Sequence, residues 1–491
     1  MKRKKINLFL YLLLICLFSM SIVEKTIDND TYFSIPVGNK ILNQGFYTEE
    51  DFTFIEGLKY QNVRWIFDVI ISTIYNQFGY CGIYVFVMIS AVIIAYSLFY
   101  ILYRRNNNVS GAFIFTIITM YMARNVFTAR AQMISFLLFI WEYYYIYNLI
   151  KSKNVKYIIL LFVDAVLLAN IHASVFPLYF IMYLPFIAEE ILSKIKIWNK
   201  DNSKIIIEDN KSIIFLIFTM ILGGCGGLLS PSGVAPYINI FKTVGEVSSD
   251  FISEMKPVVP VTAIEFTCFW CAIIGILTFS KAKIKLSDSL MILGFTILTF
   301  SNYRSIYFLI FFGMIGMYDI LTSFYEEYKL NEFVINDFKI KIGVSIVIIL
   351  FILVFSVSNF EKHFLKQYED YNNCAVGVVD YIYNNFSKEE ISKMRIYNGY
   401  NYGSYLEFKK IPVFIDPRAE IYLSTYNDTH VLEDYLKLEF GMVHYNVIFQ
   451  KYNINYVLVE NDSIIKNYIY EDTNWKLLYK DEYFCFYEKN T

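Results

Sequence analysis

The sequence contains few of the residues from which metal and nucleic-acid sites are built. It has seven cysteines, none of them in a Cys-x-x-Cys pair, and four scattered histidines, His172, His363, His430 and His444. This spacing does not match a zinc site. The net charge of −2 over 491 residues provides no basic surface for a nucleic acid. We therefore expect neither a zinc enzyme nor a nucleic-acid-binding protein.

Charged residues are scarce as well, whereas apolar residues are abundant. Only 18% of the residues are charged, while 56% are hydrophobic and 19% are aromatic, and the mean hydropathy is +0.42. A soluble domain of this composition would lack the polar residues needed to cover its surface. The composition predicts an α-helical polytopic membrane protein.

Eleven apolar runs fit membrane-spanning helices, which need roughly 20 apolar residues each. They cover residues 6–23, 81–103, 109–123, 131–149, 155–171, 174–192, 212–230, 259–280, 286–301, 305–323 and 341–358. We therefore expect about eleven transmembrane helices in a domain of residues 1–358. The first run follows "MKRKK" and is not followed by an A-x-A cleavage pattern, which favours an uncleaved anchor over the alternative, a signal peptide.

The connecting segments predict the orientation, because cytoplasmic loops carry an excess of Lys and Arg. That excess falls on "MKRKK" and on the connections "YRRNNN", "KSKNVK", "SKIKIWNKDNSK", "SKAKIK" and "EEYKLNEFVINDFKIK". We therefore expect a multi-pass protein of the cell membrane with a cytoplasmic N-terminus. Eleven spans would then place the first long loop and the C-terminal tail outside the cytoplasm.

The tail, residues 359–491, has the pattern of a small α/β domain. The segments "MRIYN", "PVFID", "INYVLVE" and "EYFCFYEK" read as short strands, and "DTHVLEDYLKLEF" and "DSIIKNYIYED" read as helices between them. Cys374 and Cys485 are both in this tail, and an extracytoplasmic location would permit a disulfide. Whether they pair is left open by the sequence.

The first outer loop, residues 24–80, begins with two aspartates, Asp28 and Asp30, in "DNDTYFSIPVGNKI". An acidic turn, "FYTEEDFTFIEG", and the segment "NVRWIFDVIISTIYNQFG" follow. The first and last of these segments have the pattern of amphipathic helices that are too polar to span. We expect both helices to lie along the outer surface of the membrane.

In this order the features resemble the GT-C glycosyltransferase superfamily, in a bacterial branch with an extracytoplasmic C-terminal domain. The resemblance rests on "DTYFSIPVGNKILNQG", "WIFDVIISTIYNQFG", "TARAQMISFLLF", "LLANIHAS", "SPSGVAPY", "ISEMKP", "SNYRSIYFLIFF" and "YNGYNYGSYLEFKKIPVFIDPRAEIY". The chain departs from the branch at Ala131, where Pro is usual, and at Pro417, where Gly is usual. The second departure removes a backbone donor.

The resemblance implies an enzyme that takes a sugar from a polyprenyl-phosphate-linked donor and passes it to a cell-surface glycan or protein acceptor. Negative charge develops on the phosphate as the sugar leaves, and arginines suit that charge. The attacking hydroxyl needs a carboxylate as general base. We expect Asp30 to be this base, and we expect the residues that bind substrate to be Arg124, Arg130, His172, Glu254 and Arg304.

No cofactor is required by the sequence, but a divalent metal is an open alternative. Asp28 and Asp30 form an Asp-x-Asp pair, which holds a metal in some glycosyltransferases. An aspartate just after a helix is also a common solvated loop residue. If a metal is bound, we expect Asp28 and Asp30 to be its ligands.

Two other functional classes stay open. Asp164 and Glu265 lie within apolar runs, where ionisable groups are costly, and we expect both to face the bundle interior. Such residues would suit a transporter or flippase for a lipid-linked or anionic solute, or a structural pair with Asn170 or an outer arginine. The large tail would suit a non-catalytic envelope binding protein, and in it Asp416 and Arg418 are expected to form an internal salt bridge or a turn cap.

Overall fold

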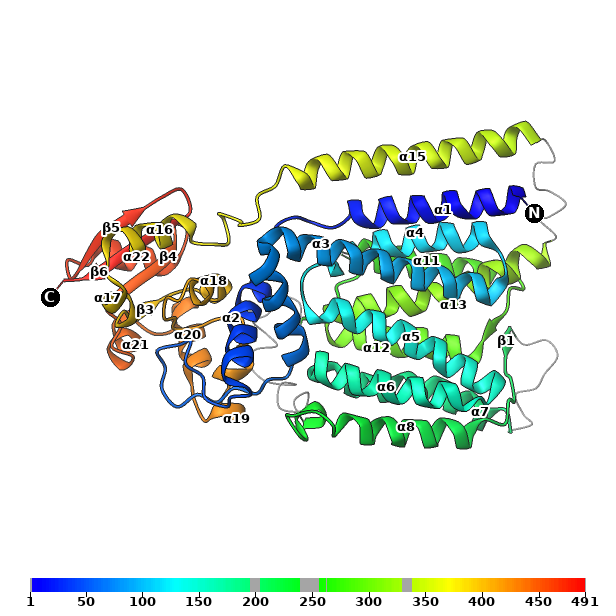
Figure 1. Ribbon diagram of the computed structural model, residues 1–491, viewed down its shortest axis with the longest axis horizontal. Helices are drawn as coiled ribbons and strands as arrows, with labels where there is room; N and C mark the ends of the chain where they lie inside the picture. The colour runs from blue at the N-terminus through cyan, green and yellow to red at the C-terminus, as the bar shows by residue number, and fades with distance from the viewer. Residues whose placement is uncertain (1, 195–203, 239–255, 262, 329–337, 491) are drawn as a thin grey trace. The chain divides into compact units, whose positions relative to one another are not determined.

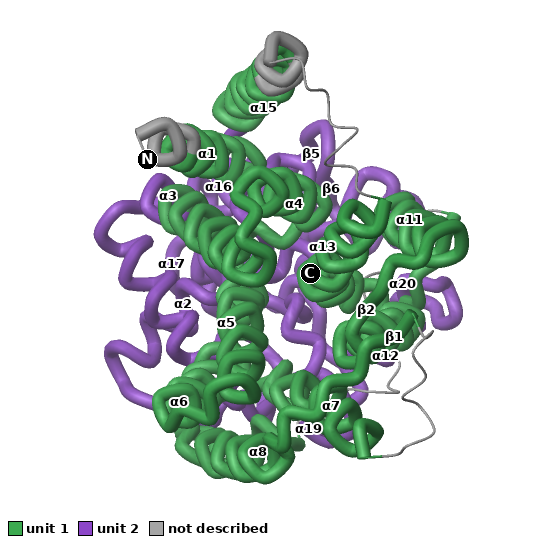
Figure 2. The backbone as a smooth tube through the Cα atoms, turned by 90° about the vertical axis from the view of Figure 1, so that its right-hand side faces the viewer, with its two compact units in different colours: residues 1–24, 84–240, 249–365 green, residues 25–83, 241–248, 366–491 purple. Residues whose placement is uncertain are grey.

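A computed structural model of the chain describes residues 2–194, 204–238, 256–261, 263–328 and 338–490. The described residues form two compact units, which are coloured separately in Figure 2. Unit 1 contains residues 1–24, 84–240 and 249–365, and unit 2 contains residues 25–83 and 366–491 as its main parts. The first long loop thus belongs to the same unit as the C-terminal tail.

Unit 1 is a bundle of helices that lie side by side, roughly along one common direction (Figure 1). Each of the eleven apolar runs predicted from the sequence lies on one of these helices. They are α1 (Lys2–Ser21), the later part of α3 (Trp65–Asn106), α4 (Val109–Met122), α5 (Ala131–Ser152), α6 (Val155–Ile171), α7 (Pro177–Leu192), α8 (Ile213–Gly227), α11 (Ile264–Phe279), α12 (Leu286–Ser301), α13 (Ile306–Glu327) and α15 (Phe338–Phe364).

Five helical segments are long and apolar enough to cross a membrane. They are Trp65–Asn106, Ala131–Ser152, Ala173–Leu192, Tyr303–Glu327 and Ile346–Phe364. Five other apolar helices are shorter, between 10 and 17 residues. The positions of the predicted helices therefore agree with the structure, whereas the count of eleven spans stays a prediction.

One end of the bundle is held together by a buried arginine. Arg105, at the end of α3, is only 4% exposed at its side chain and forms ion pairs with Asp288 of α12 and Asp319 of α13. Its guanidinium also donates a hydrogen bond to the hydroxyl of Tyr143 on α5. Since a guanidinium carries five fixed donors, one side chain can join four helices at this end. In the same unit, β1 (Ile205–Ile206) pairs in parallel with β2 (Ile284–Lys285).

Unit 2 contains a four-stranded sheet with short helices around it (Figure 1). The strand order is β3 (Ile396–Tyr397), β4 (Tyr456–Glu460), β6 (Phe484–Lys489) and β5 (Trp475–Lys480), with β3 parallel to β4 and the other pairs antiparallel. The helices are α2 (Asn29–Gln44), the first part of α3, α16 (Val376–Asn385), α17 (Lys388–Ser392), α18 (Gly403–Phe408), α19 (Ser424–Asn427), α20 (Val431–Glu439), α21 (Tyr445–Lys451) and α22 (Ile464–Glu471).

The small sheet of the tail confirms most of the predicted elements. Three of the four predicted strands and both predicted helices are present. The segment "PVFID" is not a strand: Val413 forms only isolated bridges, to Thr53 and to Ile396, and the preceding Pro412 has no N–H to donate. β5 was not predicted, because half of its side chains are exposed and "WKLLYK" does not alternate.

Cys374 and Cys485 are both buried and both free. The Cys485 thiol donates a hydrogen bond to Oδ1 of Asn461 at 2.9 Å. Each thiol therefore occupies a site of its own in unit 2, and the sheet is held by its ladder and core without a bond between the two.

The two predicted surface helices of the first loop are present, but α2 has a protein partner. Its apolar residues Tyr32, Phe33, Ile35 and Val37 are buried, and α2 packs against α18 of the tail. The second helix is the first part of α3, which changes direction at Gly79, where φ is 60°. The apolar side that predicted a position on the membrane surface is thus covered by the C-terminal part of the same unit.

Gly38 permits the close contact between α2 and α3. A Cβ at this position would lie 2.1 Å from the carbonyl oxygen of Asp68 and 2.6 Å from Cβ of Ser72. We expect Gly38→Ala to lower the free energy of unfolding by about 1–3 kcal/mol, because the helices would have to separate. Thermal unfolding of the purified full-length protein measures this change.

The matched control is Gly294→Ala in α12, where a Cβ would meet no atom within 4 Å. Alanine is favoured over glycine in a helix by roughly 1 kcal/mol, so this variant should be at least as stable as the wild type. Equal stability of the two variants would contradict the described contact of α2 with α3.

Candidate functional site

The two aspartates of the first loop occupy different positions at the start of α2. Asp28 is the N-cap: it has extended backbone angles, and its Oδ1 accepts a hydrogen bond from the N–H of Asp30 at 3.0 Å. Asp30 lies in the first helical turn, where the N-terminal end of the helix dipole favours a negative charge. Both side chains are half-buried. Asp28 therefore has a structural role that Asp30 does not share.

A cation near Asp30 was not predicted from the sequence. The guanidinium of Arg64 interacts electrostatically with the carboxylates of Asp68 and Asp30, and it lies 4.2 Å from the centre of the Phe33 ring. Asp68 is fully buried, and neither of its carboxylate oxygens has a hydrogen-bond partner among the described residues. Arg64 thus favours the ionised form of Asp30 at the start of α2.

The centre of unit 2 is a buried ionic cluster around Arg418. This side chain is 1% exposed, and it contacts three carboxylates from three segments: Glu50 at 2.7 Å, Asp416 at 2.8 Å, and Glu407. The hydroxyl of Tyr422 also donates to Asp416. The predicted salt bridge between Asp416 and Arg418 is confirmed, whereas the contributions of Glu50 and Glu407 were not foreseen.

One guanidinium cannot neutralise the charge of three carboxylates. The pKa values of the acids in the Arg418 cluster are therefore shifted in different directions. Burial opposes the charged form of Asp416, but the charge and hydrogen bonds of Arg418 outweigh burial and lower the pKa of Asp416. Burial raises the pKa of Glu407 well above its usual value of 4.5, and it also raises the pKa of Glu50. The cluster therefore favours a proton on one of the two glutamates.

Arg124 lies in the short turn η1 (Arg124–Val126) that connects α4 with α5. Its two terminal nitrogens each lie 3.3 Å from Oε1 of Glu265, and its Nη1 also donates to the carbonyl of Tyr121 at 3.0 Å. Glu265 occupies the first turn of α11 and is 30% exposed at its side chain. Glu265 therefore lies at a helix end and not deep in the bundle, and its pairing with Arg124 confirms the alternative of a structural pair with an outer arginine.

Arg130 and His172 are brought to neighbouring helix ends. Arg130 occupies the N-cap position of α5, and His172 the C-cap position of α6. Ser135, in α5, has its Oγ 2.8 Å from Nδ1 of His172 and 3.0 Å from the carbonyl oxygen of Ala131. The serine hydroxyl can donate either to that carbonyl or to Nδ1, and in the first case Nδ1–H of His172 is the donor. The ring of His172 is thus oriented by α5.

Arg304 lies in η5 (Tyr303–Ser305), between α12 and α13. Its neighbour Tyr303 interacts electrostatically with Arg124 and Glu265. The N–H of Tyr303 donates to the carbonyl of Lys256 at 2.7 Å. Glu254 lies outside the described residues, but the segment that follows it is attached beside Arg304. Asp28 and Asp30 belong to unit 2, whereas Arg124, Arg130 and Arg304 belong to unit 1.

Two carboxylates lie inside the helix bundle. Asp164 of α6 is 4% exposed, as predicted, and Glu142 of α5 is fully buried. The two interact electrostatically, and neither oxygen of Glu142 has a hydrogen-bond partner among the described residues. Glu142 was not predicted, although an acidic residue inside "FIWEYYY" is the signal that could have identified it.

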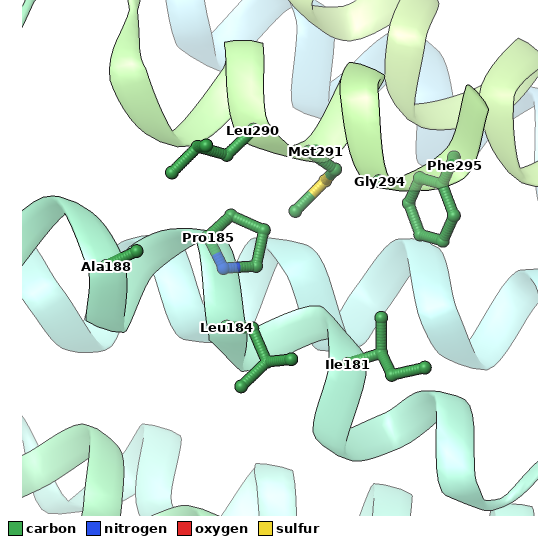
Figure 3. A pocket seen from close by; sticks show the side chains of 8 residues that line it. All are labelled: Ile181, Leu184, Pro185, Ala188, Leu290, Met291, Gly294 and Phe295. Carbon is green, nitrogen blue, oxygen red and sulfur yellow. The ribbon is translucent and has the colours of Figure 1, made fainter. Parts of the chain in front are cut away.

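A small apolar pocket of about 240 Å³ lies between α7 and α12 (Figure 3). It contains no ionisable side chain, so it suits a hydrocarbon chain and offers no catalytic group. The residues that line it are Ile181, Leu184, Pro185, Ala188, Leu290, Met291, Gly294 and Phe295.

No protein-family model and no curated protein sequence matches the chain. Three solved structures of the oligosaccharyltransferase of Archaeoglobus fulgidus are similar in fold. The structure of AglB with an inhibitory peptide and a dolichol-phosphate has a TM-score of 0.62 at 11% identity, covering 93% of this chain and 70% of that one. The structure tethered to an acceptor peptide with the NVT sequon has a TM-score of 0.60 at 11% identity, with coverages of 93% and 69%.

The apo form of that oligosaccharyltransferase has a TM-score of 0.56 at 12% identity, covering 92% of this chain and 69% of its own. The similarity extends over nearly the whole chain, so it includes both the helix bundle and the tail. The chain is a membrane protein with the GT-C fold, which confirms the fold that the sequence resemblance predicted.

The Arg418 cluster predicts how stability depends on pH. Because the folded-state pKa of Glu407 lies above its unfolded value of 4.5, the folded protein binds that proton more tightly. The contribution of Glu407 to stability should therefore be complete below about pH 4.5 and decrease as the pH rises toward the folded pKa, by up to roughly 1.4 kcal/mol per pH unit. Glu407→Gln cannot ionise and should have a smaller slope of unfolding temperature between pH 5 and 8.

Glu433→Gln provides the control, since Glu433 is an exposed carboxylate on α20. This variant should keep the wild-type slope. A Glu407→Gln protein with the same slope as the wild type would show that Glu407 is ionised throughout this range.

Proposed function

We propose that this chain is a membrane glycosyltransferase that moves a sugar from a polyprenyl-phosphate-linked donor to an acceptor on the outer side of the membrane. The observation that carries the proposal is the GT-C fold, together with arginines gathered at helix ends and a carboxylate at the start of α2. The AglB structure contains a dolichol-phosphate, and the shared fold supports a lipid-linked donor here as well. The sugar itself is not part of the proposal.

The orientation follows from the charges on the connecting segments. With "MKRKK" in the cytoplasm and every apolar helix crossing the membrane, the connections α4–α5, α6–α7 and α12–α13 would lie at the outer end of unit 1. These connections contain Arg124, Arg130, His172 and Arg304. Unit 2 is then extracytoplasmic. Arginines are usually more frequent on the cytoplasmic side of a membrane protein. Their proposed position on the outer side therefore favours a role in binding an anionic substrate.

Arg124 is suited to bind the donor phosphate. Its contacts with Glu265 are long, at 3.3 Å, compared with about 2.7–2.9 Å for strong charge-assisted hydrogen bonds. The Arg124 side chain is also 35% exposed. A phosphate can therefore compete with Glu265 for this guanidinium, while Arg130 and Arg304 supply further positive charge as the sugar leaves. Glu254 and His172 are proposed as secondary contacts.

Asp30 is proposed as the general base. The acceptor hydroxyl must lose its proton to a carboxylate that is ionised before the reaction, and both the helix N-terminus and Arg64 favour that form of Asp30. Asp28 uses Oδ1 as a helix cap, and the described residues contain no group of three His, Cys, Asp or Glu side chains that could hold a metal ion.

The test compares two conservative variants in the same motif. Asp30→Asn should lower kcat for sugar transfer by roughly 10²–10⁴-fold, the usual contribution of a general base. Asp28→Asn should stay within a few-fold of the wild type, because asparagine is an equally good N-cap. Radiolabelled lipid-linked sugar and purified protein provide the assay.

Wild-type transfer in the Asp30→Asn protein would refute the assignment of the base. Equal and severe losses in both variants, with unchanged thermal stability, would instead indicate a metal held by the pair.

A transporter or flippase is the second candidate, and the buried Glu142–Asp164 pair favours it. Two acids without a described cationic partner in a bundle are a common feature of proton and ion pathways. If the chain transports, Asp164→Asn and Glu142→Gln should abolish uptake or flipping of a lipid-linked substrate in proteoliposomes, whereas Asp30→Asn should not. If the chain is the proposed enzyme, the order of effects should be reversed.

A further inference from the structure

Unit 2 contains a cavity that the donor chemistry does not use. Its volume is about 880 Å³, within the range of roughly 300–1,000 Å³ found for small-molecule sites. The cavity lies between α2, Tyr75 of α3 and the segment from Glu407 to Pro412. We propose that it binds an uncharged sugar unit of the acceptor, so that the substrate class on the acceptor side is a glycan. This inference rests on the proposed glycosyl transfer.

The first argument is an unsatisfied carboxylate oxygen in the wall of the cavity. Glu407 is 2% exposed, and its Oε1 accepts a hydrogen bond from Arg418. Its Oε2 has no hydrogen-bond partner within the described part of the chain. A buried polar atom without a partner costs about 1–3 kcal/mol. A ligand hydroxyl that forms a hydrogen bond with Oε2 would remove this cost.

The second argument is the set of amide side chains on α2. Asn39, Asn43 and Gln44 all line the cavity. The Oδ1 of Asn39 accepts from Ser72 at 2.7 Å and from Asn76 at 2.6 Å, so its amide nitrogen is oriented as a donor for a further partner. Each amide supplies both donors and acceptors, which is what the hydroxyls of a sugar require.

The third argument is an aromatic surface beside these polar groups. The rings of Tyr75 and Phe408 both line the cavity and pack edge to face, with their centres 5.3 Å apart. Half-exposed rings of this kind offer an apolar surface to the C–H groups of a sugar ring, while the polar wall meets its hydroxyls. Neither half of the wall would suit a purely hydrocarbon ligand.

The charges and the backbone argue against a charged ligand or a peptide. Lys40 is already paired with Asp51 at 2.6 Å, and Lys410 and Glu407 supply one further charge of each sign. In the wall itself, the backbone N–H groups of Lys410 and Ile411 donate to the backbone carbonyls of Glu407 and Leu406. Pro412 has no N–H group. A peptide strand could therefore not add to this wall through backbone donors.

The test uses full-length protein in a detergent without a sugar headgroup. Maltose, cellobiose, lactose and chitobiose are titrated in turn and followed by saturation-transfer NMR, with an Asn-Val-Thr peptide as the rival probe. We expect at least one disaccharide to bind with a Kd of about 1 mM or tighter. Asn43→Leu, at an exposed cavity position, should weaken binding roughly tenfold.

Asn384→Leu is the matched control, an exposed asparagine on α16 away from the cavity, and it should bind like the wild type. The proposal is overturned if no disaccharide binds, if Asn43→Leu binds unchanged, or if the peptide binds and loses binding in Asn43→Leu. Asp30→Asn separates the two proposals: it should bind the disaccharide normally without transferring sugar to it. Disaccharide binding by a wild-type protein that transfers no sugar would refute the enzyme and leave the cavity assignment intact.

Discussion

The structure of unit 2 depends on the contacts of one buried guanidinium. Arg418 takes its partners from the first loop, through Glu50, and from two places in the tail, through Glu407 and Asp416. Removing one member of a buried ion cluster leaves uncompensated charge and typically costs 3–5 kcal/mol. The first loop and the tail therefore fold as one body around this charge, and α2 is held against α18 as a result.

The same body positions the groups proposed for acceptor chemistry. α2 begins with the capped turn that contains Asp30, and its later turns line the cavity with amides. A single helix thus connects the proposed base with the proposed sugar site, about two and a half to four turns apart at 3.6 residues per turn. In unit 1, the cations are distributed over separate helix ends, which suits a phosphate that spreads negative charge over several oxygens.

Most of the helices and strands could be predicted from the pattern of hydrophobic residues. The pairing of residues that lie far apart in the chain could not. Each apolar run became a helix because burial of apolar surface is a local property of the sequence, and the strands with clear patterns were found for the same reason. The partners of Arg418 were missed because Glu50 lies 368 residues away in the chain. Arg64 and Glu142 were missed because a charge beside or within an apolar run shows no partner until the fold is known. An amphipathic helix was predicted after the aspartates of the first loop, but only the structure identifies Asp28 as its N-cap and separates it from the proposed base.

The pairing of Glu50 with Arg418 also sets the order of events during biosynthesis. At about 5–20 residues per second, the ribosome needs roughly 20–70 s to make the 368 residues between them. During that time α2 can pack against the first part of α3 but lacks α18, and the apolar residues that α18 would cover can contact the membrane surface. The amphipathic pattern that suggested a helix on the membrane is therefore also what the nascent loop needs while it waits for the tail. Truncation before residue 418 would leave that loop permanently in its early state, a substrate for membrane quality control.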